Sequence, residues 1–333
     1  IRDSSTSRGL GDVYKTQALY IAYDLDGSGL TGVIKLKDYF VYPFEFQTQL
    51  IEPQVDAIGD SIINLPQRSV VNTNSVVKNS GDITVAALAT TVGDLEKNTL
   101  TLSTGDGNIV VQSLSARATG YRAEAVANFT PGAGNVIPNS RLTLQREVNL
   151  SAESRSGVVS FDVNQTSGSG NFNGGMQATA SGEAALVRIR LASNQLFFDQ
   201  SVQLNATGAY AKTDFKWLDN NPTIVNFKRG LTLEAAGYKS STVANHAATH
   251  QSIIIVGDTL KLNAAGAEST TSLNIGYAAG ELKFNQGANI SATGDAASAL
   301  LDISQNFDVI PGGGTPLFFG NTLNLQAAGV NAK

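Results

Sequence analysis

One group of residues has the spacing of a calcium-binding loop, Asp24-Leu-Asp26-Gly-Ser28-Gly29. Oxygen ligands at the first, third and fifth positions, with glycine at the sixth, suit Ca²⁺, which binds about six to eight oxygens in proteins. The twelfth position holds Lys35 in place of the bidentate glutamate that completes such a loop. We weigh a calcium site formed by Asp24, Asp26 and Ser28 against a plain Asp-Gly turn between two strands, and we favour the turn. We expect no other cofactor.

The only two histidines, His246 and His250, lie four residues apart in the stretch Asn-His-Ala-Ala-Thr-His. On a helix they would share a face, and residues 240–250 are the only candidate for a short helix in this chain. A zinc-protease motif needs a glutamate directly after the first histidine, where it acts as general base, and Ala247 stands there instead. We therefore interpret both histidines as loop residues without a chemical role.

The chain repeats itself from about Thr73 onward, and the repeat decides which side chains can come together. Its frame is an apolar residue, three turn-like residues and then L-x-L-x-A-x-G, as in VGDTLKLNAAG at residues 256–266. Successive copies lie 26 to 35 residues apart, most often 28 or 29. The fifth residues of the eight copies, which we call the anchors, are Leu114, Val148, Met176, Val202, Leu231, Leu260, Ala288 and Leu323.

Apolar residues alternate with polar ones inside each copy, for example in LKLNA at residues 260–264. Alternation is the period of a strand with one buried face, and similar stretches between the copies, such as LVRIRL at residues 186–191, indicate about three short strands per unit. We predict an all-β fold, a parallel β-solenoid in which one repeat makes one coil and like residues stack about 4.8 Å apart. The alternative is an antiparallel β-sandwich or β-repeat array, with hairpin turns at links such as Gly257-Asp258.

The outward positions of equivalent strands would form ladders in a solenoid, and these can be read from the sequence. A glycan-cleaving enzyme on such a fold needs carboxylates on adjacent coils, usually with Lys or Arg nearby, for acid–base or calcium chemistry. Glu234 is the single carboxylate in the two ladders, which predicts a structural face. Asp214, Asp219, Asp302 and Asp308, which we place on loops, are the other carboxylate candidates. The first ladder is Asn149, Gln177, Gln203, Thr232, Lys261, Asn289 and Asn324, and the second is Ser151, Thr179, Asn205, Glu234, Asn263, Ser291 and Gln326.

Three segments follow from these patterns. Residues 1–17 have no structural period, and RDSSTSRGLGDVYK within them reads like a translated library linker, so we exclude them from the fold. Residues 18–72 are rich in Tyr and Phe and read as a small N-terminal β segment with two strands around the turn DGSG. Residues 73–333 form the repeat domain.

Composition restricts the classes of function. A net charge of −5, with 15% charged residues and no basic run, argues against nucleic-acid binding, which depends on clustered Lys and Arg. The absence of cysteine excludes disulfides, thiolate metal sites and cysteine nucleophiles, and it is compatible with an exported protein or a phage structural protein. No apolar window is long enough to predict a transmembrane helix.

At the motif L-x-L-x-A-x-G, residues 80–333 resemble the repeats of filamentous haemagglutinin-type adhesins and other secreted β-helical proteins. The resemblance implies an elongated, exported rod that presents its surface to a glycan, a host or a neighbour. We therefore expect a non-enzymatic structural or adhesive protein, extracellular or on a cell surface, that self-associates or binds a cell-surface glycan. The alternatives are a virion structural protein such as a phage tail fibre and, third, a β-helical polysaccharide lyase or hydrolase.

Overall fold

A computed structural model gives the fold of the chain, and all secondary structure in its described residues is β-strand. None of these residues belongs to a helix that could span a membrane. The structure describes residues 19–24, 31–36, 69–73, 77–89, 96–104, 108–132, 140–153, 155–165, 168–218, 223–247, 251–277, 279–305 and 317–333.

The N-terminal segment contains one described pair of strands, β1 (Leu19–Asp24) and β2 (Thr31–Leu36). They pair antiparallel, with Asp24 opposite Thr31. This agrees with the prediction of two strands around the DGSG turn. The residues of the turn itself, and the aromatic-rich stretch after residue 36, lie outside the described part of the chain.

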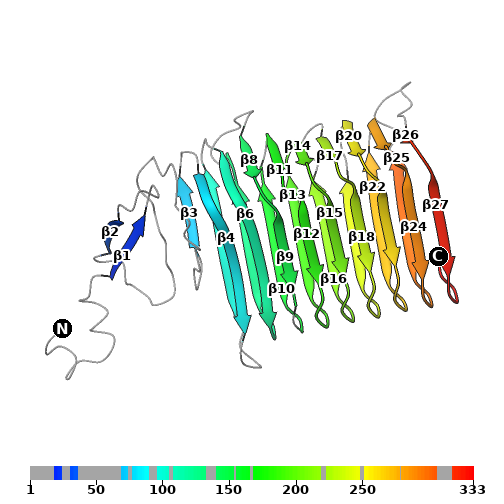
Figure 1. Ribbon diagram of the computed structural model, residues 1–333, viewed down its shortest axis with the longest axis horizontal. Helices are drawn as coiled ribbons and strands as arrows, with labels where there is room; N and C mark the ends of the chain where they lie inside the picture. The colour runs from blue at the N-terminus through cyan, green and yellow to red at the C-terminus, as the bar shows by residue number, and fades with distance from the viewer. Residues whose placement is uncertain are drawn as a thin grey trace.

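Three strands make one turn of the remaining structure, as in β14 (Gln195–Phe198), β15 (Val202–Ala206) and β16 (Lys212–Leu218). Each of them pairs in parallel with the equivalent strand of the next repeat, so that β14, β15 and β16 lie beside β17, β18 and β19. Parallel pairing between residues one repeat apart confirms the β-solenoid and rules out the antiparallel alternative for these strands. The coils follow one another along the long axis, from β4 to β27 (Figure 1).

The coils form one sheet of nine strands and a second sheet of sixteen strands that contains two rows. The nine-stranded sheet comprises β3 (Ser69–Thr73), β5 (Lys97–Thr104), β7 (Glu124–Thr130), β10 (Val158–Asn164), β13 (Leu186–Ala192), β16, β19 (Ser241–Ala247), β22 (Thr270–Tyr277) and β25 (Ser298–Gln305). The first row of the larger sheet comprises β8 (Arg141–Leu144), β11 (Ser169–Phe172), β14, β17 (Thr223–Phe227), β20 (Gln251–Val256), β23 (Ala279–Phe284) and β26 (Leu317–Phe319). The second row comprises β9 (Val148–Ala152), β12 (Met176–Ala180), β15, β18 (Leu231–Ala235), β21 (Leu260–Ala264), β24 (Ala288–Thr293) and β27 (Leu323–Ala328).

Two longer strands, β4 (Val77–Ala89) and β6 (Ile109–Gly120), join the two rows at the N-terminal end. In β6, Val111 lies opposite Leu144, and Leu114 lies opposite Val148. Two residues therefore separate Val111 from Leu114, whereas three separate Leu144 from Val148. With one residue fewer, β6 stays a single strand across the place where the later coils turn from one row to the other.

The predicted repeat frame is confirmed by the register of the strands. All eight anchors pair in one continuous row, from Leu114 to Leu323. Ile83 of β4 lies opposite Leu114 and extends the row by one coil. The stacked part begins with β3 at Ser69, slightly before the expected boundary at residue 73.

Stacked apolar side chains fill the space between the sheets. Phe172, Phe198 and Phe227 occupy one register position in successive coils, and their rings stack with centroids 4.7 and 5.0 Å apart. All three are fully buried. Stacked ring pairs contribute about 0.5–1.5 kcal/mol each beyond the burial of their area, so this row ties consecutive coils together.

The one candidate for a short helix, residues 240–250, is not a helix in its described part, because residues 241–247 form β19. This strand pairs in parallel with β16 and β22 on either side. Its side chains alternate, with Thr242, Ala244 and His246 buried and the residues between them half-buried. The stacking of coils overrides the weak local preference for a helix turn.

Each coil turns from the second row into the nine-stranded sheet through a tight corner that contains one strained residue. Its amide donates a hydrogen bond to the corner of the next coil, as from Tyr210 N to Tyr238 O at 2.8 Å. A left-handed conformation costs a non-glycine residue about 1–2 kcal/mol, and this inter-coil hydrogen bond helps to offset the cost. The strained residues are Arg122, Ser156, Ala184, Tyr210, Lys239, Glu268, Ala296 and Asn331, all with φ between 51° and 58°.

In every corner except that of Ser156, a glycine stands two residues before the strained residue, where the corners stack closely. In the corner that contains Tyr210, a Cβ on Gly208 would lie 2.6 Å from the carbonyl oxygen of Ser181 and still closer to that of Gly182, both in the preceding coil. Real Cβ atoms do not approach backbone oxygens so closely. Any side chain at Gly208 would therefore force these two coils apart.

Opposite effects on stability are expected from two substitutions at this contact. Gly208→Ala should lower the free energy of unfolding by about 2 kcal/mol or more, because the methyl group meets backbone atoms. Ala184→Gly should be neutral or raise it by up to about 1 kcal/mol, because glycine adopts positive φ without strain. Urea unfolding followed by circular dichroism measures both, and equal losses in the two variants would contradict this account of the corner.

Candidate functional surfaces

The two ladders predicted from the sequence are present on the outer face of the second row, with every pairing as expected. We call this surface the neutral face. Its side chains are half-buried or exposed, and some are hydrogen-bonded along the ladder. Asn324 donates to Asn289 at 2.7 Å, and Ser291 donates to Asn263 at 3.0 Å. The neutral face is a regular array of hydrogen-bonding groups that crosses seven successive coils, and its only charged ladder residues are Glu234 and Lys261.

The N-terminal end of the neutral face carries one charged pair that the sequence ladders did not include. Arg117 lies opposite Ser151, and its guanidinium donates a hydrogen bond to the carboxylate of Glu153. Ser151 Oγ donates a second one at 2.7 Å. These interactions, chiefly the one from Ser151, hold the pKa of Glu153 below its ordinary value, although partial burial acts in the opposite direction.

The outer face of the nine-stranded sheet carries a group of six charged side chains in the middle of the solenoid. We define the charged face by Asp162 on β10, Arg188 and Arg190 on β13, and Lys212, Asp214 and Lys216 on β16. Arg190 lies between Asp162 and Lys216, and Arg188 lies beside Asp214. Four cationic groups on this face outnumber two carboxylates, in a chain whose net charge is −5.

The arginines of the charged face are available to a ligand. Lys216 Nζ lies 4.0 Å from the carboxylate of Asp214, which is the limiting distance for an ion pair. Among the described residues, neither Arg188 nor Arg190 has an ion-pair partner. Arg190 is exposed and Arg188 is half-buried. Unpaired guanidiniums on a flat surface can bind carboxylate, sulfate or phosphate groups through paired hydrogen bonds.

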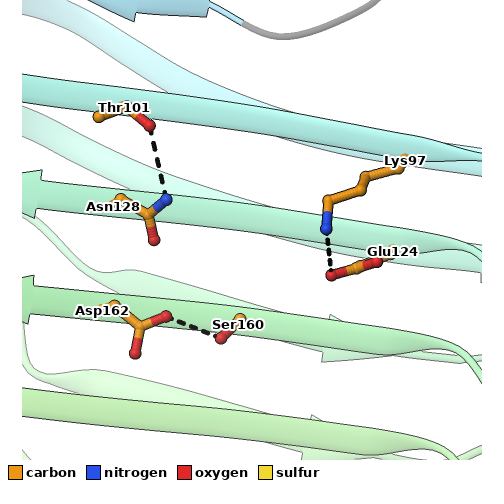
Figure 2. A network of polar contacts seen from close by, with 6 residues as sticks. All are labelled: Lys97, Thr101, Glu124, Asn128, Ser160 and Asp162. Carbon is orange, nitrogen blue, oxygen red and sulfur yellow. Dashed lines mark hydrogen bonds and ion pairs between the residues drawn. The ribbon is translucent and has the colours of Figure 1, made fainter.

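The same face continues toward the N-terminus as a polar network, which Figure 2 shows on β5, β7 and β10. Lys97 Nζ donates to Glu124 at 2.8 Å, and its charge is thereby paired. Asn128 donates to Thr101 at 3.5 Å in the neighbouring coil. Ser160 Oγ donates to Asp162 at 2.9 Å, so one carboxylate of the charged face has a fixed orientation.

The sequence interpretation missed the charged face because it read ladders only on the second row. It placed Asp214 and Asp302 on loops, which is wrong, since they lie on β16 and β25. Asp219 and Asp308 lie outside the described residues. The available signal was the alternation in LVRIRL and KTDFKWL, where charged side chains take the outward positions of two consecutive strands.

The predicted calcium ligands are not brought together by any described contact. Asp24 is the last residue of β1 and its side chain is not among those described, and Asp26 and Ser28 also lie outside the described residues. In the part of the chain that the structure describes, no three His, Cys, Asp or Glu side chains are grouped so as to hold a metal ion. The calcium site therefore stays a prediction.

His246 is a core residue of β19, so its assignment to a loop is wrong. It is 2% exposed, and its ring stacks on Trp217 with centroids 5.3 Å apart. Its Nδ1 lies 3.2 Å from the carbonyl oxygen of Trp217, and its Nε2 lies 3.3 Å from Ser252 Oγ. These contacts indicate packing between coils rather than metal binding. His250 falls outside the described residues.

Comparison with protein families, with curated proteins and with solved structures finds no match to this chain. The resemblance to haemagglutinin-type repeats therefore stays a prediction from the motif. The two outer surfaces of the solenoid carry the argument about function.

The low pKa of Glu153 predicts a defined pH response. Because the folded-state pKa lies below the ordinary glutamate value of 4.5, ionised Glu153 stabilises the fold above that pH, and the stabilisation is lost as the pH falls through the folded-state pKa. We expect Ser151→Ala to raise the pKa of Glu153 toward 4.5, as measured by NMR titration of its side-chain carboxyl. Thr179→Ala changes the equivalent position one coil away and should have no effect. A pKa that is unchanged in Ser151→Ala would contradict the assigned cause.

Proposed function

We propose that this chain is a non-enzymatic adhesive rod, extracellular or on a cell surface, that presents polar β surfaces to a glycan or to partner subunits. The observation that carries the proposal is the neutral face, whose two ladders continue in register through seven coils. The resemblance of its repeats to secreted adhesins supports the same conclusion.

The mechanism is geometric. Coils spaced by about 4.8 Å place equivalent side chains about 29 Å apart from the first to the seventh, which matches the extent of several sugar units. Each amide or hydroxyl contributes a weak hydrogen bond, and many such contacts along one rigid surface act together. Because the face is almost uncharged, its binding should depend little on ionic strength.

A virion fibre is the second candidate. The ladders of the neutral face present similar polar side chains in register through seven coils, and such a surface would also serve side-by-side pairing with a second copy of the chain.

A salt series on glycan-coated surfaces tests the adhesive function. The full chain should bind at least one glycan, with an affinity that changes less than about threefold between 0.05 and 0.5 M salt. Gln177→Glu combined with Gln203→Glu should weaken binding roughly tenfold, because the ladder then carries adjacent like charges. Glu281→Gln lies on the first row and serves as the control. Depolymerisation of the glycan by the pure protein would overturn the proposal in favour of an enzyme.

Sedimentation separates the adhesin from the fibre. A fibre subunit should form concentration-dependent oligomers that Gln177→Glu combined with Gln203→Glu disrupts, because adjacent like charges would be buried in the interface. Glu281→Gln, on the first row, should leave the oligomers intact. A chain that stays monomeric at all concentrations would exclude the fibre.

A further inference from the structure

Two tyrosines stand exposed at the corners of adjacent coils. Tyr210 is 52% exposed and Tyr238 is 44% exposed, and their rings meet edge to face with centroids 5.5 Å apart. Tyr210 also holds the strained corner position, with φ 56°, which is unusual for a bulky side chain. Because about half of the Tyr210 side chain is exposed, burial in the core does not compensate for the strain of its backbone.

A network of side chains orients the second tyrosine. Tyr238 Oη donates to Glu268 at 3.3 Å, and Lys239 Nζ lies 3.2 Å from the carboxylate of Glu268. Lys239 Nζ also lies 5.2 Å from the centroid of the Tyr238 ring. The pair of tyrosines is therefore a partly fixed aromatic surface with a hydrogen-bonding rim, which is the composition of many sugar-binding sites.

The corner tyrosines adjoin the charged face. Lys212 begins β16 two residues after Tyr210, and Arg188 lies one strand away, beside Asp214 of β16. Arg188 and Arg190 project from the same side of β13, about 6.6 Å apart along the strand. Aromatic rings and unpaired cations thus lie at neighbouring positions on the outside of the coils of β13, β16 and β19.

We propose that this surface binds an acidic glycan. Its sugar rings pack on Tyr210 and Tyr238, and its carboxylate or sulfate groups pair with Arg188, Arg190 and Lys212. This inference rests on the proposed adhesive function and adds to the neutral face a second site, on the charged face, that takes acidic glycans. Guanidinium forks match the planar geometry of carboxylates. Two carboxylates stand among the four cations of the charged face and the chain has no basic run, whereas binding of nucleic acid depends on clustered Lys and Arg, so the site favours a glycan over DNA.

The test compares the full chain and two variants on four immobilised polymers: polygalacturonate, dextran sulfate, plain dextran and single-stranded DNA. We expect polygalacturonate or dextran sulfate to bind, and the stronger of the two identifies the acidic group. Arg188→Gln combined with Arg190→Gln should weaken that binding roughly tenfold or more and reduce its dependence on salt. Tyr210→Gly should weaken it severalfold while relieving strain, so that loss of binding is not loss of fold.

Two control variants make the result specific. Lys261→Gln removes a cation from the neutral face, and Ala184→Gly changes the strained position of another corner, so neither should affect acidic glycans. Equal binding by the arginine variant and the full chain, or DNA binding as tight as glycan binding, would overturn the proposal. Binding to plain dextran alone would overturn it too, while leaving the adhesive function standing. If no glycan bound at all, both this proposal and the proposed binding of glycans by the neutral face would be wrong.

Discussion

The in-register stacking of equivalent residues is the constraint on which the rest of the structure depends. Every strand of a coil takes its hydrogen bonds from the coils before and after it, so a residue can occupy a position only if it suits its own copies about 4.8 Å away. Rows of Phe, Leu and Ala satisfy this condition inside, and rows of Asn, Gln, Ser and Thr satisfy it outside. Long rows of like charges do not satisfy it, which agrees with a composition with only 15% charged residues.

The fold and the neutral face could be predicted because they depend on a repeated local pattern. The anchors, the alternation after them and the outward ladders all follow from one frame, and each pairing agrees with it. The predictions that the structure contradicts fall on residues outside that frame. Residues 241–247 contain few strand-forming side chains. Only their pairing with β16 and β22 shows that they form a strand. The calcium prediction falls on residues that the described structure does not test.

The charged face shows why a surface can be harder to predict than the fold beneath it. Asp162, Arg190 and Lys216 are separated by more than twenty residues each, and only the register of β10, β13 and β16 aligns them. Their strands belong to the part of the repeat whose sequence varies most, where no anchor guides an alignment. The variable strand therefore holds the chemistry that distinguishes one coil from another, while the regular strand supplies the scaffold.

The nearly identical corners have a further consequence, which concerns evolution. Because each corner bonds only to the corners of the neighbouring coils and repeats the same backbone angles, a coil can be duplicated or deleted without disturbing the path of the others. The length of the rod and the pattern of its outer surface can then change independently. Gene duplication lengthens the rod in equal steps, and later point mutations in one outward row change what that step recognises. A lineage could in this way alter the spacing between its contact points without having to invent a new fold.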